Sequence, residues 1–194
     1  GSEAGNSELT FPTIDSAARN LPSAKLAVIS VNGLFAAREA RKALENDLHV
    51  MLFSDNVSVE EEIELKNMAH ERGLLMMGPD CGTAIIGGVG LCFANQVRPG
   101  SIGIVGASGT GSQEVSVRVH DFGGGISQLI GTGGRDLSER VGGMMMLDGM
   151  RALNQDEATK VIVLISKPPA KSVEEKVLAE IKNMSKPVVV CFIG

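Results

Sequence analysis

The sequence predicts an α/β fold made of two units that each contain a parallel sheet. Short apolar segments alternate with amphipathic segments along most of the 194 residues, and this alternation is typical of parallel strands joined by helical crossovers. Glycine-rich turns follow several of the apolar segments. The alternation stops at Arg98-Pro99-Gly100 and then starts again, which indicates a boundary between two units.

Residues 1–25 precede the first unit. Residues 1–10 are small, polar and acidic and predict a flexible linker, and residues 13–20 predict a short helix. The first unit then covers residues 26–97, and the second unit covers residues 98–194.

Apolar segments and helix-end signals define the elements of the first unit. Strands are predicted at 26–31, 49–53 and 74–77, and amphipathic helices at 34–45 and 58–72. The second helix begins with a capping box made by Ser58 and Glu61 and ends at Gly73. Glycines alternate with apolar residues over 85–95, which predicts a hairpin.

The second unit repeats the alternation of strand and helix. Strands are predicted at 102–105, 126–130, 161–165 and 187–193, and helices at 112–122, 142–153 and 172–184. We expect the strand at 102–105 to be central in its sheet. Because ligands bind beyond the carboxyl ends of parallel strands, the glycine-rich turns at those ends are candidate binding sites.

The composition argues against several classes of function. A formal net charge of -5 and an aromatic content of 3% argue against a nucleic-acid-binding protein. No apolar run is long enough to span a membrane. The three cysteines, Cys81, Cys92 and Cys191, are not spaced like zinc ligands and favour a reducing, cytoplasmic compartment. We therefore expect no metal site, no nucleic-acid partner and no membrane partner.

The segment 101–114, SIGIVGASGTGSQE, carries the strongest indication of a ligand site. A predicted strand ends in small residues, and a helix is expected to begin near Ser112, so the first N–H groups of that helix have no partners. Such groups and the helix dipole attract a phosphate, an acyl phosphate or a carboxylate. Ser108 and Thr110 offer hydroxyl groups, and we expect a Cβ at Gly109 to block the anion or forbid the backbone angles. An ordinary tight turn is the alternative interpretation.

Three turns together resemble those of one family. The turn Gly78-Pro79-Asp80-Cys81, the segment Ser108-Gly109-Thr110 and the turn Gly131-Thr132-Gly133-Gly134 are similar in order and spacing to turns of the α subunit of succinyl-CoA synthetase and related acyl-CoA ligases. The resemblance covers about residues 26–194. Segments such as 53–57 (FSDNV) and 166–169 (SKPP) more closely resemble the FdrA-type branch of acyl-CoA-synthetase-like proteins.

The resemblance implies that residues 26–97 form part of a Rossmann-like CoA-binding domain and that residues 98–194 form a flavodoxin-like ligase domain. It implies CoA, a nucleotide and phosphate as ligands, an acyl or carbamoyl phosphate as substrate, and a partner subunit or a homo-oligomer. The CoA-binding candidates are Asn32, Gly33, Ser54 and Asp55. The phosphate- or substrate-binding candidates are Ser108, Gly109, Thr110, Gly111, Gly133, Gly134 and Arg135.

Two positions depart from the family pattern, and both are candidate catalytic residues. Asp80 replaces an asparagine, and it can bind an amide or ammonium group or cap its own turn. Lys167 stands where the synthetases carry a glutamate that supports their phosphohistidine. A lysine there favours an anionic ligand, and a solvated loop lysine is the alternative. The phosphohistidine would lie past Gly194 and the glycine-rich CoA loop before residue 1, so we expect this chain to bind CoA weakly or not at all.

These residues leave more than one function open. One hypothesis is an FdrA-type enzyme or enzyme subunit, either an acid–thiol ligase or an acyl or carbamoyl transferase. The alternatives are a CoA-, nucleotide- or acid-binding module without catalysis, and a structural subunit that docks a catalytic partner. We also expect Cys81 to pack under its turn, Arg135 to bind either an anion or Asp136, and the methionines between Met144 and Met150 to fill the core.

Overall fold

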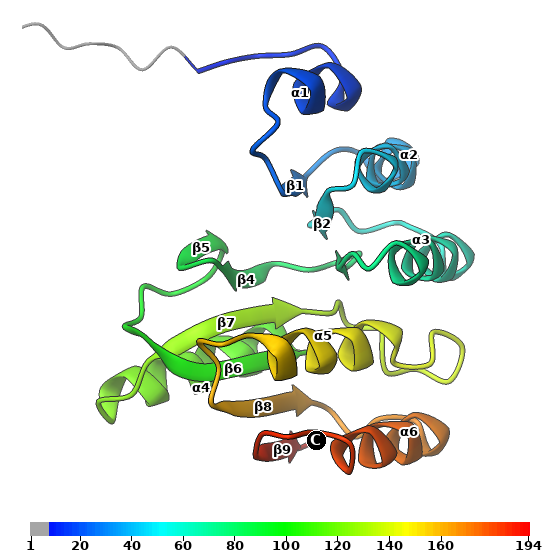
Figure 1. Cartoon of the computed structure of the whole chain (residues 1–194). Coiled ribbons are helices and arrows are strands. Elements are labelled where there is room, and N and C mark those ends of the chain that lie inside the picture. The colour runs from blue at the N-terminus through cyan, green and yellow to red at the C-terminus, as the bar shows by residue number, and fades with distance from the viewer. Residues whose placement is uncertain (1–7) are drawn as a thin grey trace, which may run out of the picture.

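The computed structural model describes residues 8–194 and contains two sheets with helices packed against them (Figure 1). The predicted linker at 1–10 lies mostly outside the described residues. The short helix predicted at 13–20 is α1 (Ile14–Asn20), and Thr13 caps it by accepting a hydrogen bond from the N–H of Ser16. Among the described residues, no helix combines the length and the apolar character needed to cross a membrane.

The first unit is a parallel sheet of three strands in the order β1-β2-β3. Its elements are β1 (Leu26–Ile29), α2 (Gly33–Glu45), β2 (His49–Leu52), α3 (Val59–Glu71) and β3 (Met76–Met77). The predicted capping box at the start of α3 is confirmed, because Ser58 accepts the N–H of Glu61 and the Glu61 side chain accepts the N–H of Ser58. Gly73, just past the end of α3, has a left-handed φ of 67°.

The second sheet has six strands in the order β5-β4-β7-β6-β8-β9 and is mixed, not wholly parallel. It includes the hairpin strands at 83–92, which were predicted within the first unit, so the second unit is counted from Thr83 from here on. Its elements are β4 (Thr83–Ile86), β5 (Val89–Cys92), β6 (Pro99–Gly106), α4 (Gly109–Asp121), β7 (Ile126–Gly131), α5 (Met144–Gln155), β8 (Val161–Ser166), α6 (Lys171–Ile181) and β9 (Val188–Phe192). The hairpin predicted at 85–95 is formed by β4 and β5, and it joins this sheet because β4 pairs antiparallel with β7. The two-residue turn between β4 and β5 joins antiparallel strands. Because β4 also runs antiparallel to β7, the hairpin makes an otherwise parallel sheet mixed.

Strand β6 is central in the second sheet, as predicted, because it lies between β7 and β8. The four strands β7-β6-β8-β9 are parallel. Figure 1 shows α4 behind this sheet and α5 in front of it. Helix α6 packs on the same side as α5, because its Val173 and Val177 belong to the same buried cluster as the methionines of α5. The chain therefore winds in opposite directions from β6, and in such sheets the ligand crevice lies at the carboxyl end of the central strands.

One core joins the two units. Met51 and Met77 of the first sheet belong to the same buried cluster as the methionines of α5. Met145, Met146 and Met150 are at most 2% exposed, which confirms their expected packing role. Helix α3 of the first unit also contacts α5 of the second.

Two helices begin more than one residue away from their predicted starts. Helix α4 begins at Gly109 instead of Ser112, because Ser108 caps the first turn with its side chain and the glycines after it can adopt helical angles. Helix α5 begins at Met144 instead of residue 142, because Gly142 and Gly143 have left-handed φ values of 78° and 73°.

Candidate functional site

Three turns converge at the carboxyl ends of β3, β6 and β7. The N–H of Gly78 donates to the carbonyl of Thr132 at 3.3 Å, and the N–H of Thr132 donates to the carbonyl of Gly106 at 2.9 Å. The turn after β3 therefore contacts the turn after β7, and that turn contacts the end of β6. The structure brings together the three turns that carry the family resemblance.

Glycine is required at this edge because the turns approach one another so closely. A Cβ on Gly131 would lie 2.5 Å from Cys81 Sγ and 2.7 Å from the carbonyl oxygen of Thr83. Gly133 has a φ of 83°, and a Cβ there would collide with the carbonyl oxygen of Pro79. Any larger residue at these two positions would separate the turns.

Gly109 does not share this requirement. Its φ lies outside the left-handed region, and a Cβ would lie 3.6 Å from Thr83 Oγ1, which is an ordinary van der Waals contact. The expectation that a side chain at Gly109 forbids the backbone angles is therefore wrong. The reason is that Gly109 is the first residue of α4 and has ordinary helical angles.

Helix α4 presents its N-terminus at the same edge. Ser108 Oγ accepts the N–H of Gly111 at 3.1 Å, so that N–H is already bonded. The N–H groups of Gly109 and Thr110 have no acceptor among residues 8–194. Of the four expected phosphate-binding residues in this segment, two therefore offer unpaired amides, while Ser108 and Gly111 bond to each other.

Asp80 lies between two hollows at this edge. Its backbone is left-handed, with a φ of 57°, and its N–H donates to the carbonyl of Ser54 at 3.0 Å. Asp80 lines a hollow of about 290 Å³ together with Asp55 and Arg135. It also lines a smaller hollow beside Gly109. The negative charge of Asp80 therefore borders both spaces in which a ligand can lie.

Arg135 reaches back to the first unit. Its Nε donates to Glu62 Oε1 at 3.0 Å, and its Nη2 donates to the carbonyl of Val57 at 2.7 Å. Within residues 8–194 its ion pair is with Glu62 and not with Asp136, whose side chain instead accepts the N–H groups at the start of α5. The Arg135 side chain is 42% exposed, so it also faces solvent in the larger hollow.

A buried charged group lies behind this edge, and its residues were not among those predicted from the sequence. Lys66 Nζ donates to Glu62 Oε2 at 2.7 Å, to Asp136 Oδ1 at 2.8 Å and to the carbonyl of Thr132 at 2.9 Å. The side chains of Lys66, Glu62 and Asp136 are at most 1% exposed. All three ammonium donors are therefore satisfied, which a buried lysine requires.

The sequence does contain a signal for this group. Glu62 and Lys66 are spaced i, i+4 and share the buried face of α3 with Leu65 and Ala69. A lysine on the apolar stripe of a helix predicts a buried ion pair. The position of Asp136, 70 residues away from Lys66, has no comparable signal in the sequence.

The sequence of the second unit identifies the family of the chain. Residues 97–194, half of the chain, match the family described as "CoA binding domain". The chain belongs to the CoA-binding domain family. The matched residues contain β6–β9 and the N-terminus of α4, whereas the resemblance assigned the CoA-binding-type domain to residues 26–97.

Relatives of this CoA-binding-family chain are longer than the chain itself. It is 68% identical over 191 residues to a protein of Escherichia coli strain K12 described as "Uncharacterized protein YahF", and it covers 98% of this chain and 37% of YahF. It is 30% identical over 192 residues to "Succinate--CoA ligase [ADP-forming] subunit alpha 2" of Archaeoglobus fulgidus, covering 95% of this chain and 65% of that protein. The homologues of the chain thus include α subunits of succinate–CoA ligases.

Solved structures share the fold. The chain superposes on ATP citrate lyase from Methanothrix soehngenii in complex with citrate and coenzyme A, with a TM-score of 0.80 and 22% identity over 93% of this chain and 31% of that chain. It also superposes on the apo form of a dinucleotide-forming acetyl-coenzyme A synthetase from Ca. Korarchaeum cryptofilum, with a TM-score of 0.65 and 20% identity over 86% of this chain and 37% of that chain. The structural neighbours of the family member are therefore acyl-CoA synthetases and ATP citrate lyase.

The four CoA-binding candidates lie together at the carboxyl ends of β1 and β2. Asn32 caps α2 by accepting the N–H of Leu34 at 3.1 Å. A Cβ on Gly33 would lie 2.7 Å from the carbonyl oxygen of Asp55, so this close approach also requires glycine. The hydroxyl of Ser54 is bonded to the backbone of the turn after β1, since it donates to the carbonyl of Val31 and accepts the N–H of the same residue. Ser54 therefore supports the loop and leaves Asp55 exposed beside it.

Cys81 and Lys167 differ in their relation to the site. Cys81 packs in the core under its turn, as expected, and burial raises the pKa of its thiol to about 11. Lys167 is exposed just past the end of β8 and lines neither of the two hollows beside Asp80. No group of three potential metal ligands occurs in the described part of the chain.

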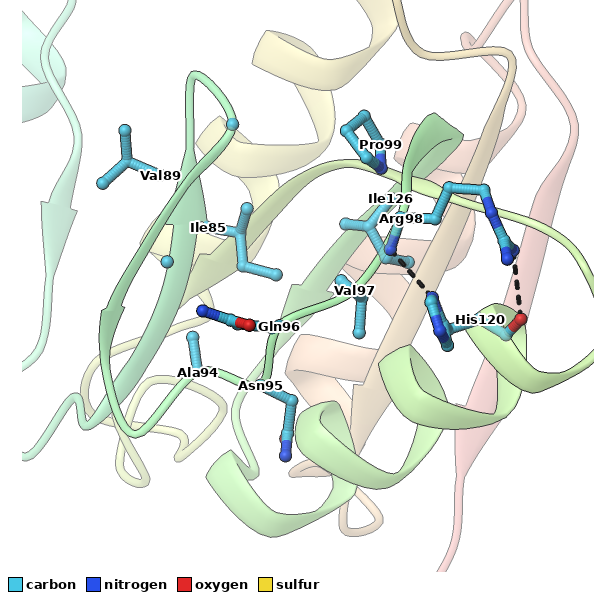
Figure 2. Close-up of a pocket in the computed structure, with 12 residues that line it drawn as sticks. Ile85, Val89, Ala94, Asn95, Gln96, Val97, Arg98, Pro99, His120 and Ile126 are labelled. Carbon is cyan, nitrogen blue, oxygen red and sulfur yellow. Dashed lines mark hydrogen bonds between the residues drawn. The ribbon is translucent and has the colours of Figure 1, made fainter.

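A further cavity, of about 810 Å³, lies at the opposite end of the second sheet, between the hairpin and the loop that follows it (Figure 2). Its lining includes Pro99 and Ile126, the first residues of β6 and β7. Two of its polar residues are bonded to each other, because the N–H of Arg98 donates to His120 Nδ1 at 2.9 Å and Arg98 Nη1 donates to the carbonyl of His120 at 3.1 Å. None of the site residues predicted from the sequence lines this cavity.

Proposed function

We propose that this chain is the part of an FdrA-type, acyl-CoA-synthetase-like enzyme that binds CoA and holds an acyl or carbamoyl phosphate at the N-terminus of α4. The observation that carries the proposal is the convergence of the turns after β3, β6 and β7 beside the unpaired amides of Gly109 and Thr110. The relatives named as α subunits of succinate–CoA ligase support it, as does the CoA-complexed ATP citrate lyase of the same fold. By the same analogy, the chain works with a partner subunit.

The phosphoryl group of the substrate would accept hydrogen bonds from Gly109 and Thr110. These donors are fixed before the substrate arrives, because the cap of Ser108 orders the first helical turn. Donors that need no rearrangement stabilise developing charge most effectively. The helix dipole adds a favourable interaction with the anion.

Asp80 favours a substrate whose transferable group carries N–H donors. A carboxylate at the junction of the two hollows repels a second carboxylate and attracts an amide or ammonium group. A carbamoyl phosphate supplies such N–H groups next to its phosphate, whereas a dicarboxylic acyl phosphate does not. We therefore propose the carbamoyl compound as the better substrate of the two.

CoA would lie along the turns after β1 and β2 and enter the larger hollow. Gly33 and Asp55 border the start of this path, and Arg135 stands at its end. The Nη1 group of Arg135 has no acceptor among residues 8–194, so it can donate to a phosphate of CoA.

A binding module without catalysis is the second candidate function. The state of Cys81 supports this candidate. Burial raises the pKa of its thiol, so the thiol stays protonated near neutral pH and does not act as a nucleophile. The position of Lys167 outside both hollows agrees with this alternative.

Titrations of the ¹⁵N-labelled chain with inorganic phosphate, carbamoyl phosphate and CoA test the proposal. We expect phosphate and carbamoyl phosphate to shift the amide signals of Gly109 and Thr110 more than that of Gly111, whose N–H is bonded to Ser108. CoA should shift Gly33 and Asp55. Shifts confined to other parts of the chain would overturn the site assignment. Phosphorus NMR of carbamoyl phosphate, with and without CoA and a partner subunit, then separates an enzyme from a binding module.

A further inference from the structure

We propose a second ligand site, for a small neutral carbonyl compound, in the cavity between the two units. The cavity has a volume of about 200 Å³ and is lined by Leu26 and His49, the first residues of β1 and β2, and by Gln128 and Ile130 within β7. None of its lining residues belongs to the turns that hold the proposed phosphate site. Both units contribute apolar side chains to its wall. These are Leu26, Leu75 and Met77 from the first unit and Ile86, Ile130 and Leu153 from the second.

His49 supplies the first hydrogen-bond donor of this cavity. Its Nδ1 accepts the N–H of Leu75 at 3.0 Å, so the ring proton of the neutral imidazole lies on Nε2. Nε2 has no partner among residues 8–194. Burial lowers the pKa of His49, which keeps the ring neutral near physiological pH.

Gln128 supplies the second donor. Its Oε1 accepts the N–H of Gly87 at 2.8 Å. This bond fixes the orientation of the side-chain amide and identifies the other terminal atom as the NH₂ nitrogen. That NH₂ group has no acceptor within the described residues. An apolar wall with two unpaired donors is complementary to a compact apolar molecule that carries one carbonyl oxygen.

The carboxylate of Asp156 favours a neutral ligand over an anionic one. It also lines the cavity, and its carboxylate accepts the hydroxyl of Thr159 at 2.7 Å. A ligand carboxylate would be repelled by this charge, whereas a ketone, ester or amide would not. The volume is smaller than that of pockets for drug-sized ligands, so the site suits a molecule of about the size of a substituted benzene ring.

Acetophenone is the probe for this site, and two molecules of similar size are its controls. Benzoate replaces the ketone by a carboxylate, and isopropylbenzene removes the acceptor. We expect acetophenone to shift the signals of His49, Gln128 and Leu153 in ¹⁵N-labelled chain, while Gly109 and Thr110 stay unchanged. Isopropylbenzene should bind about two- to tenfold more weakly, the effect of one or two lost hydrogen bonds. Benzoate keeps its acceptors but should also bind more weakly, because the carboxylate of Asp156 repels its charge. The absence of any acetophenone shift at these residues up to its solubility limit, or equal binding of all three compounds, would overturn the proposal.

Variants of the lining residues separate this cavity from non-specific binding. Ala152→Phe fills the space from α5, so it should abolish the shifts, and Ala179→Phe on the exposed surface of α6 is the matched control. His49→Asn keeps an acceptor for the N–H of Leu75 and loses the Nε2 donor, so it should weaken binding about two- to tenfold. If Ala152→Phe does not fold, His49→Asn and Gln128→Glu decide the question. Unchanged affinity in both of these variants would exclude the site.

Discussion

Lys66 Nζ of α3 lies 2.8 Å from Asp136 Oδ1 in the turn before α5, and both side chains are buried. This ion pair joins the first unit to the turn that follows β7. Because Glu62 pairs with Lys66 and also accepts from Arg135, the same group fixes a residue that lines the proposed CoA path. The buried charges therefore connect the packing of the two units to the geometry of the proposed site.

We expect Lys66→Met to lower the free energy of unfolding by about 3–5 kcal/mol, because it leaves the buried carboxylate of Asp136 without a cation and Glu62 with Arg135 alone. Urea denaturation measures this change. Arg118→Met is the matched control, since Arg118 pairs with Glu114 on the surface and its loss should leave stability unchanged within error. Equal stabilities of the two variants would contradict the role of the buried group.

Gly106→Ala should destabilise the chain by about 1–3 kcal/mol, because its Cβ would collide with Ser112 Oγ inside a packed turn. Gly109→Ala should be neutral or slightly stabilising, since alanine is preferred to glycine in a helix and its Cβ has room. Thermal unfolding of both variants gives the comparison. A larger loss for Gly109→Ala than for Gly106→Ala would show that the N-terminus of α4 is packed differently.

Removal of the Asp80 charge should strengthen phosphate binding at the N-terminus of α4. We expect Asp80→Asn to bind phosphate about two- to fivefold more tightly at low ionic strength, and the gain should shrink as salt is added. The shift of the Gly109 amide reports the affinity. Asp121→Asn, at the other end of α4, is the control and should have no effect on it. Equal affinities of Asp80→Asn and the unmodified chain would place Asp80 too far from the anion to matter.

The depressed pKa of His49 predicts a loss of stability in mild acid. Above its ordinary pKa of 6.5 the ring is neutral in both the folded and unfolded chain, so it adds no pH dependence. As the pH falls below 6.5, the unfolded chain binds a proton that the buried ring resists, and the free energy of unfolding falls by up to about 1.4 kcal/mol per pH unit until the folded pKa is reached. Denaturation of the unmodified chain and of His49→Asn between pH 7.5 and 5 should differ by this slope. Parallel profiles would show that His49 is not responsible.

The three cysteines should differ in their reactivity toward a thiol reagent. Cys92 is exposed, whereas Cys81 is buried and has a pKa raised to about 11. At pH 8 we expect rapid modification of Cys92 in the native chain and modification of Cys81 only after unfolding. Mass spectrometry of the modified peptides measures both rates. Fast labelling of native Cys81 would contradict its burial and its raised pKa.

The sequence by itself determined the order of the strands and helices and the turns at their ends. Alternation of apolar and amphipathic segments, the capping box of Ser58 and the small residues after β3, β6 and β7 are local features, and local features are sufficient to predict elements and strand-end turns. Because parallel strands place their carboxyl ends at one edge, the sequence also predicted that those turns are candidates for one site.

Only the tertiary structure decided which side chains at that edge remain available to a ligand. The hydroxyl of Ser54 both donates to and accepts from the backbone of Val31, whereas Ser108 Oγ accepts the N–H of Gly111 and its own O–H can still donate to a ligand. Arg135 takes Glu62 as its partner through Nε. The bonds of Ser54 and Arg135 join residues that are distant in sequence. The packing of strands within the first unit sets the partner of Ser54, and the packing of the two units sets the partner of Arg135. The same holds for Lys66, whose charge is stable in the core only because Asp136 and Thr132 are brought to it by the fold.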